Sequence, residues 1–148
     1  MAPRERLANV ADVVDDIMAL WQRLPEDPAE ARAAVLRLYA ERCEVNGVVL
    51  SVDDLLGRAR ALQAALSDLG HELLERVEAG DQMSIAFTLH GRHTGPLQTT
   101  LGVVPPTGKT VYIQGMDILT FTAGRITKIT VLSDEIGLLS RLGAVTLR

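Results

Sequence analysis

The sequence predicts an α+β domain, in which helices come first and a strongly bent antiparallel sheet closed by these N-terminal helices follows. Up to about Leu69, apolar residues recur at spacings of three and four, the helical period. Beyond that point most segments alternate apolar and polar residues and are separated by turns that contain glycine. Helices followed by strands are typical of a domain whose helices cover one side of an antiparallel sheet.

Two helices are expected in the first forty residues. Val10–Leu24 carries one apolar stripe, which includes Trp21. Asp27 then offers a capping carboxylate before a second helix. The apolar face of this second helix includes Tyr39, and the helix is expected to end near Arg42.

The third predicted helix follows a short break. Asn46-Gly47 interrupts a β-rich stretch, which suggests a strand or a hairpin turn. The run Ser51–Leu69 has the clearest helical period in the chain, and Ser51 and Asp54 stand in a capping-box relation. Gly70 is expected to terminate this helix.

Alternation predicts four strands in the second half of the chain. A segment rich in glycine and proline between the second and third strands predicts a loop. The expected strands are His71–Ala79, Gln82–Arg92, Thr110–Thr122 and Arg125–Ser133, and the expected loop is Thr94–Lys109.

Size and composition narrow the classes of function. The chain has 148 residues, which favours one domain over residues 1–148, and its formal net charge is −4. Without a basic face, nucleic acid is not an expected partner. No apolar stretch is long enough to span a membrane, so a membrane is not an expected partner either. The single cysteine, Cys43, is expected to be a core residue and fits a reducing cytoplasm.

A series of motifs in the last third of the chain carries a family resemblance. They are HTG at His93–Gly95, PPTGK at Pro105–Lys109, the segment IQGMDILTF, a turn at Ala123-Gly124, and the closing DEIGLLSRLG. In order and spacing they resemble the SnoaL-like polyketide cyclases, or ester cyclases, of the nuclear transport factor 2 fold. The resemblance implies a cone-shaped α+β barrel with a pocket, a cofactor-free cyclase of polyketide-like substrates, and a homodimer.

Asp134 is the catalytic residue that this resemblance implies. It follows the last predicted strand, where the family places a carboxylate that takes a proton from carbon and later returns it. Burial would raise the pKa of such a carboxylate and make it a stronger base. The alternative is structural, since aspartate is a favoured N-cap for the short helix predicted at Glu135–Leu142.

Two more residues are candidates for the catalytic site by resemblance. His93 could hydrogen-bond a substrate carbonyl, or it could tie down the loop that follows. Gln114 could donate a hydrogen bond to an enolate. Met116 and Ile118 share its face of the strand and are expected to contact substrate. Asp117 lies on the opposite face and matches an aspartate of the family's strand; a structural role, pairing with Arg125 or Lys128, is expected for it.

Four further residues are expected to line the pocket. Asn46 is a candidate by resemblance, although a turn at Asn46-Gly47 explains it as well. Trp21 and Tyr39 could line the helical wall or fill the core. Phe87 lies on the buried face of its strand.

Other readings of the sequence remain open. The histidines and the cysteine lack the spacing of metal ligands, and no glycine motif for phosphate is present, so neither a metal nor a cofactor is expected. The same fold could support epoxide hydrolysis or isomerisation, or a non-catalytic small-molecule-binding module. The strand ITVLSD lacks the tryptophan that many family members carry near the Thr130 position. The whole chain has only five aromatic residues, which predicts an aliphatic pocket.

Overall fold

The computed structural model describes residues 13–148. Its first helix occupies residues 13–22 of the described chain, so the predicted start at Val10 lies outside the described residues. The remaining elements are α2 (Pro28–Leu38), β1 (Tyr39–Val45), β2 (Val48–Ser51), α3 (Val52–Ala65), β3 (Leu66–Ala79), β4 (Gln82–His93), β5 (Leu97–Thr99), β6 (Gly102–Val104), β7 (Thr110–Thr122), β8 (Arg125–Ser133) and α4 (Glu135–Arg141).

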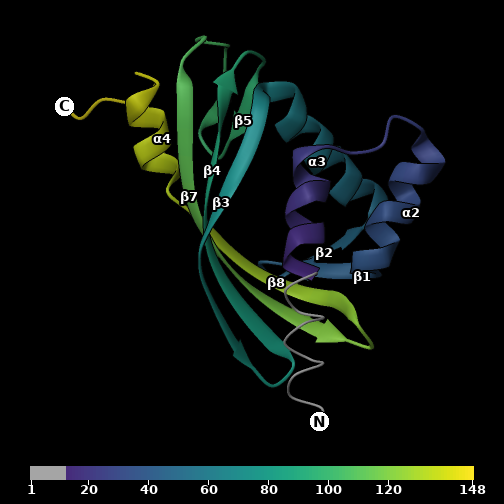
Figure 1. The fold of residues 1–148 in the computed structure, drawn as a ribbon. Coiled ribbons are helices and arrows are strands. Elements are labelled where there is room, and N and C mark those ends of the chain that lie inside the picture. The colour runs from purple at the N-terminus through teal and green to yellow at the C-terminus, as the bar shows by residue number, and fades with distance from the viewer. Residues whose placement is uncertain (1–12) are drawn as a thin grey trace.

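The main sheet has six strands in the order β2-β1-β8-β7-β4-β3 and is strongly curved (Figure 1). This confirms the predicted α+β class and the bent sheet. Two details differ from expectation. The sheet is mixed, because β1 runs parallel to β8 while the other neighbours are antiparallel. Its strand order ends at β2 and β3, so the sheet does not close into a barrel.

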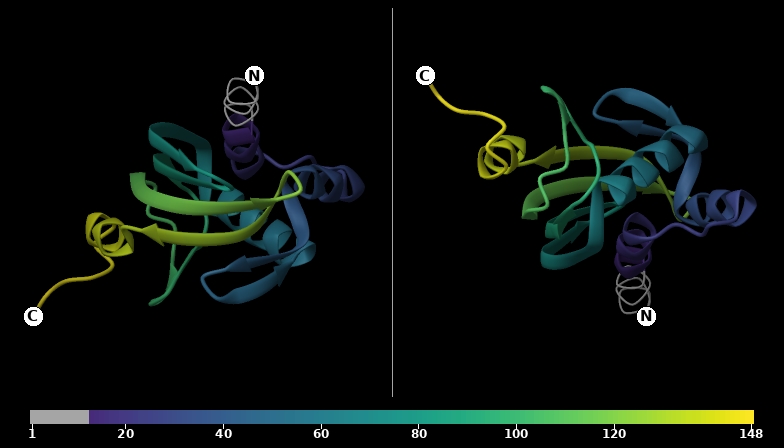
Figure 2. Two further views of the ribbon diagram at one scale, coloured as in Figure 1. Left: turned by 90° about the horizontal axis from the view of Figure 1, so that it is seen from below. Right: turned by 90° about the horizontal axis from the view of Figure 1, so that it is seen from above.

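The N-terminal helices gather on one side of this curved sheet, as Figures 1 and 2 show. The helix at residues 13–22 and α3 lie against the concave face, and α2 packs beside α3. Helix α4 lies apart from them, next to β7. The concave face of the sheet and the N-terminal helices therefore enclose the space in which a pocket can form.

Local sequence explains where the helices begin. Asp27 accepts a hydrogen bond from the backbone N–H of Glu30 at 3.0 Å and caps α2. Ser51 and Asp54 form the predicted capping box at the start of α3, each bonded to the backbone of the other. Such caps satisfy N–H groups that have no partner within the helix.

The predicted ends of two helices are wrong. Helix α2 ends at Leu38, and Tyr39 is the first residue of β1. Helix α3 ends at Ala65, and Leu66 begins β3. In both places the chain passes directly from helix to strand, so that pairing with a neighbouring strand overrides the continuing apolar period.

The segment predicted as a loop contains a small two-stranded sheet of β5 and β6. Its β5 strand contacts α3, and Leu97 of β5 is buried. Leu97 belongs to a small apolar cluster that also holds Leu66, Val111 and Leu138. The larger apolar cluster lies between the N-terminal helices and the strands β1, β4, β7 and β8. Within residues 13–148, no helix combines the length and apolar character that a membrane span requires.

Candidate functional site

A cavity of about 330 Å³ lies between the N-terminal helices and the concave face of the sheet. Residues of both apolar clusters line it, among them Ile17, Leu55, Ile85 and Leu138. Most of its wall is aliphatic, as the scarcity of aromatic residues predicted. A ligand in such a cavity would be held by apolar contacts and oriented by the few polar side chains that reach it.

Asp117 of β7 is the carboxylate placed among these apolar walls. It pairs with Ile85 on one side and Val131 on the other, and all three side chains line the cavity. Its Oδ1 atom is buried and has no hydrogen-bond partner. Burial raises the pKa of Asp117 to about 6. A carboxyl group in this environment is a stronger base than a solvated one and can also serve as an acid near neutral pH.

Trp21 and Tyr39 form a hydrogen-bonded pair in the same cavity. The indole N–H of Trp21 donates to the hydroxyl oxygen of Tyr39 at 2.7 Å. Burial is the main cause that raises the pKa of Tyr39 above its ordinary value; the hydrogen bond from Trp21 lowers that pKa in part, and the negative charge of Asp117 raises it further. The phenol therefore stays protonated. Because its oxygen accepts from Trp21, its own O–H is oriented for donation elsewhere.

His71 of β3 is a second titratable group in the cavity wall. Its Nδ1 atom is buried and has no hydrogen-bond partner. Burial lowers the pKa of His71, the charge of Asp15 acts in the opposite direction, and His90 lowers the pKa further. A neutral imidazole can donate from one ring nitrogen and accept at the other.

Polar residues also line the cavity where β5, α3 and α4 meet. Arg58 of α3, Gln98 and Thr99 of β5, and Glu135 of α4 all border it. Glu135 accepts a hydrogen bond from the backbone N–H of Thr100 at 2.8 Å, which joins α4 to the turn between β5 and β6. No ion pair links Arg58 to Glu135 or to Asp117 in the described chain.

Asp134, the residue expected to be catalytic, lies outside this cavity. It is the N-cap of α4, and its Oδ1 accepts from the backbone N–H of Gly137 at 2.9 Å. Its Oδ2 lies 3.8 Å from a guanidinium nitrogen of Arg141, and its side chain is 47% exposed. This is the geometry that the capping alternative predicts.

Gln114, Met116 and Ile118 also lie away from the cavity, because their side chains project from the convex face of β7. Met116 and Ile118 are exposed, and all three border a shallow groove that also contains Asp134. Alternation in the sequence correctly placed these three residues on one face of β7 and Asp117 on the other. The expectation that the face of Gln114 lines the pocket was wrong. The inner face carries Asp117 instead.

Phe87 lines the cavity. Its ring packs over Gly115, where a Cβ atom would come within 2.8 Å of the ring. The glycine thus makes room for an aromatic side chain on the neighbouring strand.

His93 is fully buried and does not line the cavity. Its Nδ1 lies 3.0 Å from the hydroxyl oxygen of Thr107 and accepts from the backbone N–H of the same residue at 3.3 Å. The backbone of His93 also bonds to Lys109 and Gly108. These contacts tie down the loop that follows β4, which matches the structural alternative for His93.

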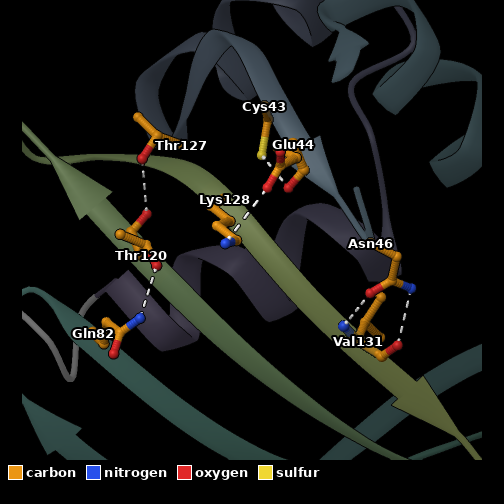
Figure 3. Close-up of polar contacts among 8 residues, drawn as sticks. All are labelled: Cys43, Glu44, Asn46, Gln82, Thr120, Thr127, Lys128 and Val131. Atoms are coloured by element: carbon orange, nitrogen blue, oxygen red, sulfur yellow. Dashed lines mark hydrogen bonds and ion pairs between the residues drawn. The ribbon is translucent and has the colours of Figure 1, made fainter. Parts of the chain in front are cut away.

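Asn46 does not line the cavity. Figure 3 shows its side chain bonded to the backbone of Val131 on the neighbouring strand. Asn46 and Gly47 have φ angles of 48° and 84°, as a two-residue hairpin turn between β1 and β2 requires. The Asn46 side chain accepts from the backbone N–H of Val131 at 2.9 Å and donates to its carbonyl at 3.1 Å. The amide group therefore extends the parallel pairing of β1 and β8.

The cavity thus brings together Trp21, Tyr39 and Phe87, but not Asn46, His93, Gln114, Met116, Ile118 or Asp134. The residues that sequence reasoning missed are Asp117 and His71. A charged residue inside the apolar alternation of β7 was the available signal for Asp117. In residues 13–148, no group of three or more His, Cys, Asp or Glu side chains could hold a metal ion.

Comparisons with known proteins show what this chain is similar to. The sequence model of the SnoaL-like polyketide cyclases matches residues 11–142. A search of curated proteins found no match.

Similar solved structures include TsrD from Streptomyces laurentii, with 21% identity, 93% of this chain and 97% of that one covered, and a TM-score of 0.78. AclR from Streptomyces galilaeus, proposed to be a hydroxylase, has 20% identity, with 95% and 88% covered and a TM-score of 0.73. IdmH from Streptomyces antibioticus, proposed to be a polyketide cyclase, has 19% identity, with 90% and 97% covered and a TM-score of 0.70. At these identities the likeness shows a shared fold.

Proposed function

Because the chain belongs to the SnoaL-like polyketide cyclase family, we propose that it closes a ring on a polyketide-like intermediate by general acid/base chemistry, without a cofactor. Asp117 is the acid/base in this proposal. One observation carries it: the Asp117 carboxylate borders a largely aliphatic cavity, has an unpartnered oxygen, and has a pKa raised to about 6 by burial. A base with such a pKa is well matched to proton transfer near neutral pH.

The reaction is an intramolecular aldol addition. The ionised carboxylate of Asp117 removes a proton from a carbon next to a carbonyl group, and the electron pair of the C–H bond forms the enolate. The enolate carbon attacks a second carbonyl of the same molecule, which forms the new C–C bond and an alkoxide. The protonated Asp117 returns its proton to the alkoxide, so that the enzyme regains its starting state.

Tyr39 is the hydrogen-bond donor to the enolate oxygen in this proposal. Its hydroxyl oxygen already accepts from Trp21 at 2.7 Å, which orients the phenol. Its raised pKa keeps the proton on the phenol while negative charge develops on the substrate. A donor fixed in advance among apolar walls stabilises such charge more than solvent does.

Proton exchange at carbon tests the proposal without the natural substrate. In heavy water, the protein is expected to accelerate deuterium uptake next to the carbonyls of a linear dodecanedione that has a carbonyl near each end. Asp117→Asn is expected to lose about 100-fold or more of this rate. Equal exchange rates in Asp117→Asn and the unsubstituted protein would refute Asp117 as the base.

A non-catalytic small-molecule-binding module is the second candidate. The observation that favours it is that Asp134, the residue at which the family resemblance implies the catalytic carboxylate, caps α4 instead. Deuterium uptake into the dione distinguishes the cyclase from the binding module. A binding module would bind the dione, as reported by the fluorescence of Trp21 in the cavity wall, but would not accelerate deuterium uptake.

We also propose that the chain forms a homodimer through the convex face of its sheet. Met116, Ile118 and Leu132 are 57%, 45% and 75% exposed on this face. Together with Leu74 they line the groove that crosses β7 and β8. Exposed apolar side chains clustered on one face are typical of a surface that contacts another protein.

A further inference from the structure

His71 places a second polar group in the cavity, well separated from Asp117 along the sheet. His71 pairs with Leu89, which pairs with Ile113, so His71 belongs to the row of Ile113 on β7. Asp117 lies four residues further along β7, about 13 Å for an extended strand. His71 is also two strands away from β7 in the sheet order. The two groups therefore contact different parts of a ligand.

The cavity wall between these two groups is apolar. Leu89, Phe87 and Ile85 lie on β4, the strand between those of His71 and Asp117, and Ile113 lies on β7 in the row of His71; all four line the cavity. A ligand that reaches both polar groups must present hydrocarbon to the wall between them. Burial of that hydrocarbon favours binding, whereas a polar group there would lose its hydrogen bonds to water.

Each of the two groups has a buried atom without a partner. Nδ1 of His71 and Oδ1 of Asp117 are both buried and form no hydrogen bond within the described chain. Leaving a buried polar atom unpaired is unfavourable, and a functional site is one place where such atoms persist. A ligand hydroxyl group could pair with Nδ1 of His71 in either tautomer, whereas a carbonyl oxygen, which only accepts, pairs with the tautomer that carries its proton on Nδ1.

We propose that His71 is a specificity-determining residue that binds a second oxygen of the substrate, far from the carbon on which Asp117 acts. The substrate class is an aliphatic chain with two carbonyl or hydroxyl groups separated by an apolar segment. The proposal rests on the proposed function only in placing the reacting carbonyl at Asp117. For the contact at His71 the substrate has to bind, but it does not have to react.

Trp21 fluorescence gives the test. Trp21 is the only tryptophan in the chain, and it lines the cavity. The probes are the linear dodecanedione with a carbonyl near each end and the matching dodecanone with one carbonyl. We expect the unsubstituted protein to bind the dione about fivefold more tightly than the monoketone, as one additional hydrogen bond predicts.

Substitutions then assign that preference to a residue. His71→Leu is expected to remove the preference for the dione, and His71→Gln, which keeps a hydrogen-bonding group, is expected to restore part of it. Glu75→Leu is the matched control, because Glu75 lies on the same strand as His71, is exposed and does not line the cavity. Glu75→Leu should keep the full preference, and the same preference in His71→Leu would overturn the proposal.

A second measurement tests the contact between His71 and the dione even if His71→Leu does not fold. In proton–nitrogen correlation spectra of the unsubstituted protein, saturating dione should shift the Nδ1 resonance of His71. No shift at saturation would overturn the contact. The unsubstituted protein distinguishes the two proposals: an effect of His71→Leu on dione binding, together with no acceleration of deuterium uptake by the unsubstituted protein, would refute the proposed function and support the contact.

Discussion

Trp21 donates its indole N–H to the hydroxyl oxygen of Tyr39 at 2.7 Å, and this bond joins the first helix to the first strand. The two residues lie 18 positions apart, and both border the cavity. One hydrogen bond therefore links the packing of the helix against the sheet to the polar chemistry of the site.

Tyr39→Phe is expected to lower the free energy of unfolding by about 1 kcal/mol, because the indole N–H of Trp21 loses its acceptor. The substitution should also slow deuterium uptake into the dione, since the proposed donor to the enolate is gone. Urea unfolding followed by Trp21 fluorescence measures the first effect. Tyr112→Phe is the control, because the Tyr112 side chain is 53% exposed and the loss of its hydroxyl group should change the free energy of unfolding little. Equal stability of the two variants would contradict the assigned role of the hydrogen bond.

Asp117→Asn is expected to change how stability depends on pH. The folded pKa of Asp117, about 6, is above that of an unfolded aspartate, so between these values the folded chain binds more protons. The contribution of Asp117 to stability is therefore greatest at low pH and is lost as pH rises through about 4 to 6.

This loss should be about 3 kcal/mol for the unsubstituted protein relative to Asp117→Asn, since the folded and unfolded pKa values differ by about two and each pKa unit corresponds to about 1.4 kcal/mol. Urea unfolding of both proteins at a series of pH values measures it. A difference in stability that stays constant across the series would show that the folded pKa of Asp117 is not raised.

Two substitutions at Asp134 separate a cap from a catalyst. Asparagine is also a good N-cap, so Asp134→Asn should cost only a few tenths of a kcal/mol, whereas Asp134→Ala should cost about 1 kcal/mol. Neither should slow deuterium uptake into the dione once the protein is folded. Loss of exchange in a folded Asp134→Asn protein would instead support the sequence-based assignment of catalysis to Asp134.

Gly95 and Gly57 are expected to respond to alanine in opposite directions. A Cβ atom at Gly95 would overlap the backbone carbonyl oxygen of Ala64, at the point where α3 ends. We expect Gly95→Ala to destabilise the protein by about 1 to 3 kcal/mol, as in other overpacked sites.

Gly57 lies within α3, and a Cβ atom there meets nothing within 4 Å. Gly57→Ala should therefore stabilise the protein by about 0.5 to 1 kcal/mol through helix propensity. Thermal and urea unfolding compare the two variants. Equal effects of the two substitutions would show that the close approach at Gly95 is relieved by a small shift of the chain.

A charge on the convex face of the sheet is expected to dissociate the proposed homodimer. Leu132→Lys and Met116→Lys place an ammonium group in the apolar groove of β7 and β8, where the dimer would have to bury it. Sedimentation velocity should show a dimer for the unsubstituted protein and monomers for both variants. Leu147→Lys, near the C-terminus and fully exposed, should remain dimeric. A monomeric unsubstituted protein would refute the proposal.

Sequence patterns predicted β4, β7 and β8 to within one residue, because the alternation along these strands does not depend on the rest of the fold. Thr110–Thr122 and Arg125–Ser133 have the predicted bounds. The inner face of β7 could not be predicted, since both faces carry apolar side chains: Met116 and Ile118 outside, Leu119 and Phe121 inside. Alternation separates two such faces without saying which one meets the helices.

The site was harder to predict than the fold for the same reason. The orientation of β7 decides whether Gln114 or Asp117 enters the cavity, and this orientation is set by packing against elements far away in sequence. Trp21 and Tyr39 were found as pocket candidates, but their hydrogen bond depends on the unexpected change from helix to strand at Tyr39. The resemblance to a family identified the fold and did not locate the polar residues of this cavity.

The parallel pairing of β1 with β8 has a consequence for synthesis of the chain. Asn46 and Val131, which bond side by side in this pair, are 85 residues apart in sequence. During translation β1 and β2 leave the ribosome long before β8 is made. Because β8 lies between β1 and β7 in the sheet, β1 and β2 cannot join the other strands until β8 emerges. Pairings over such a distance form slowly. The cavity, whose wall includes Val131, is therefore complete only after nearly the whole chain has been made, and a nascent chain cannot hold its ligand.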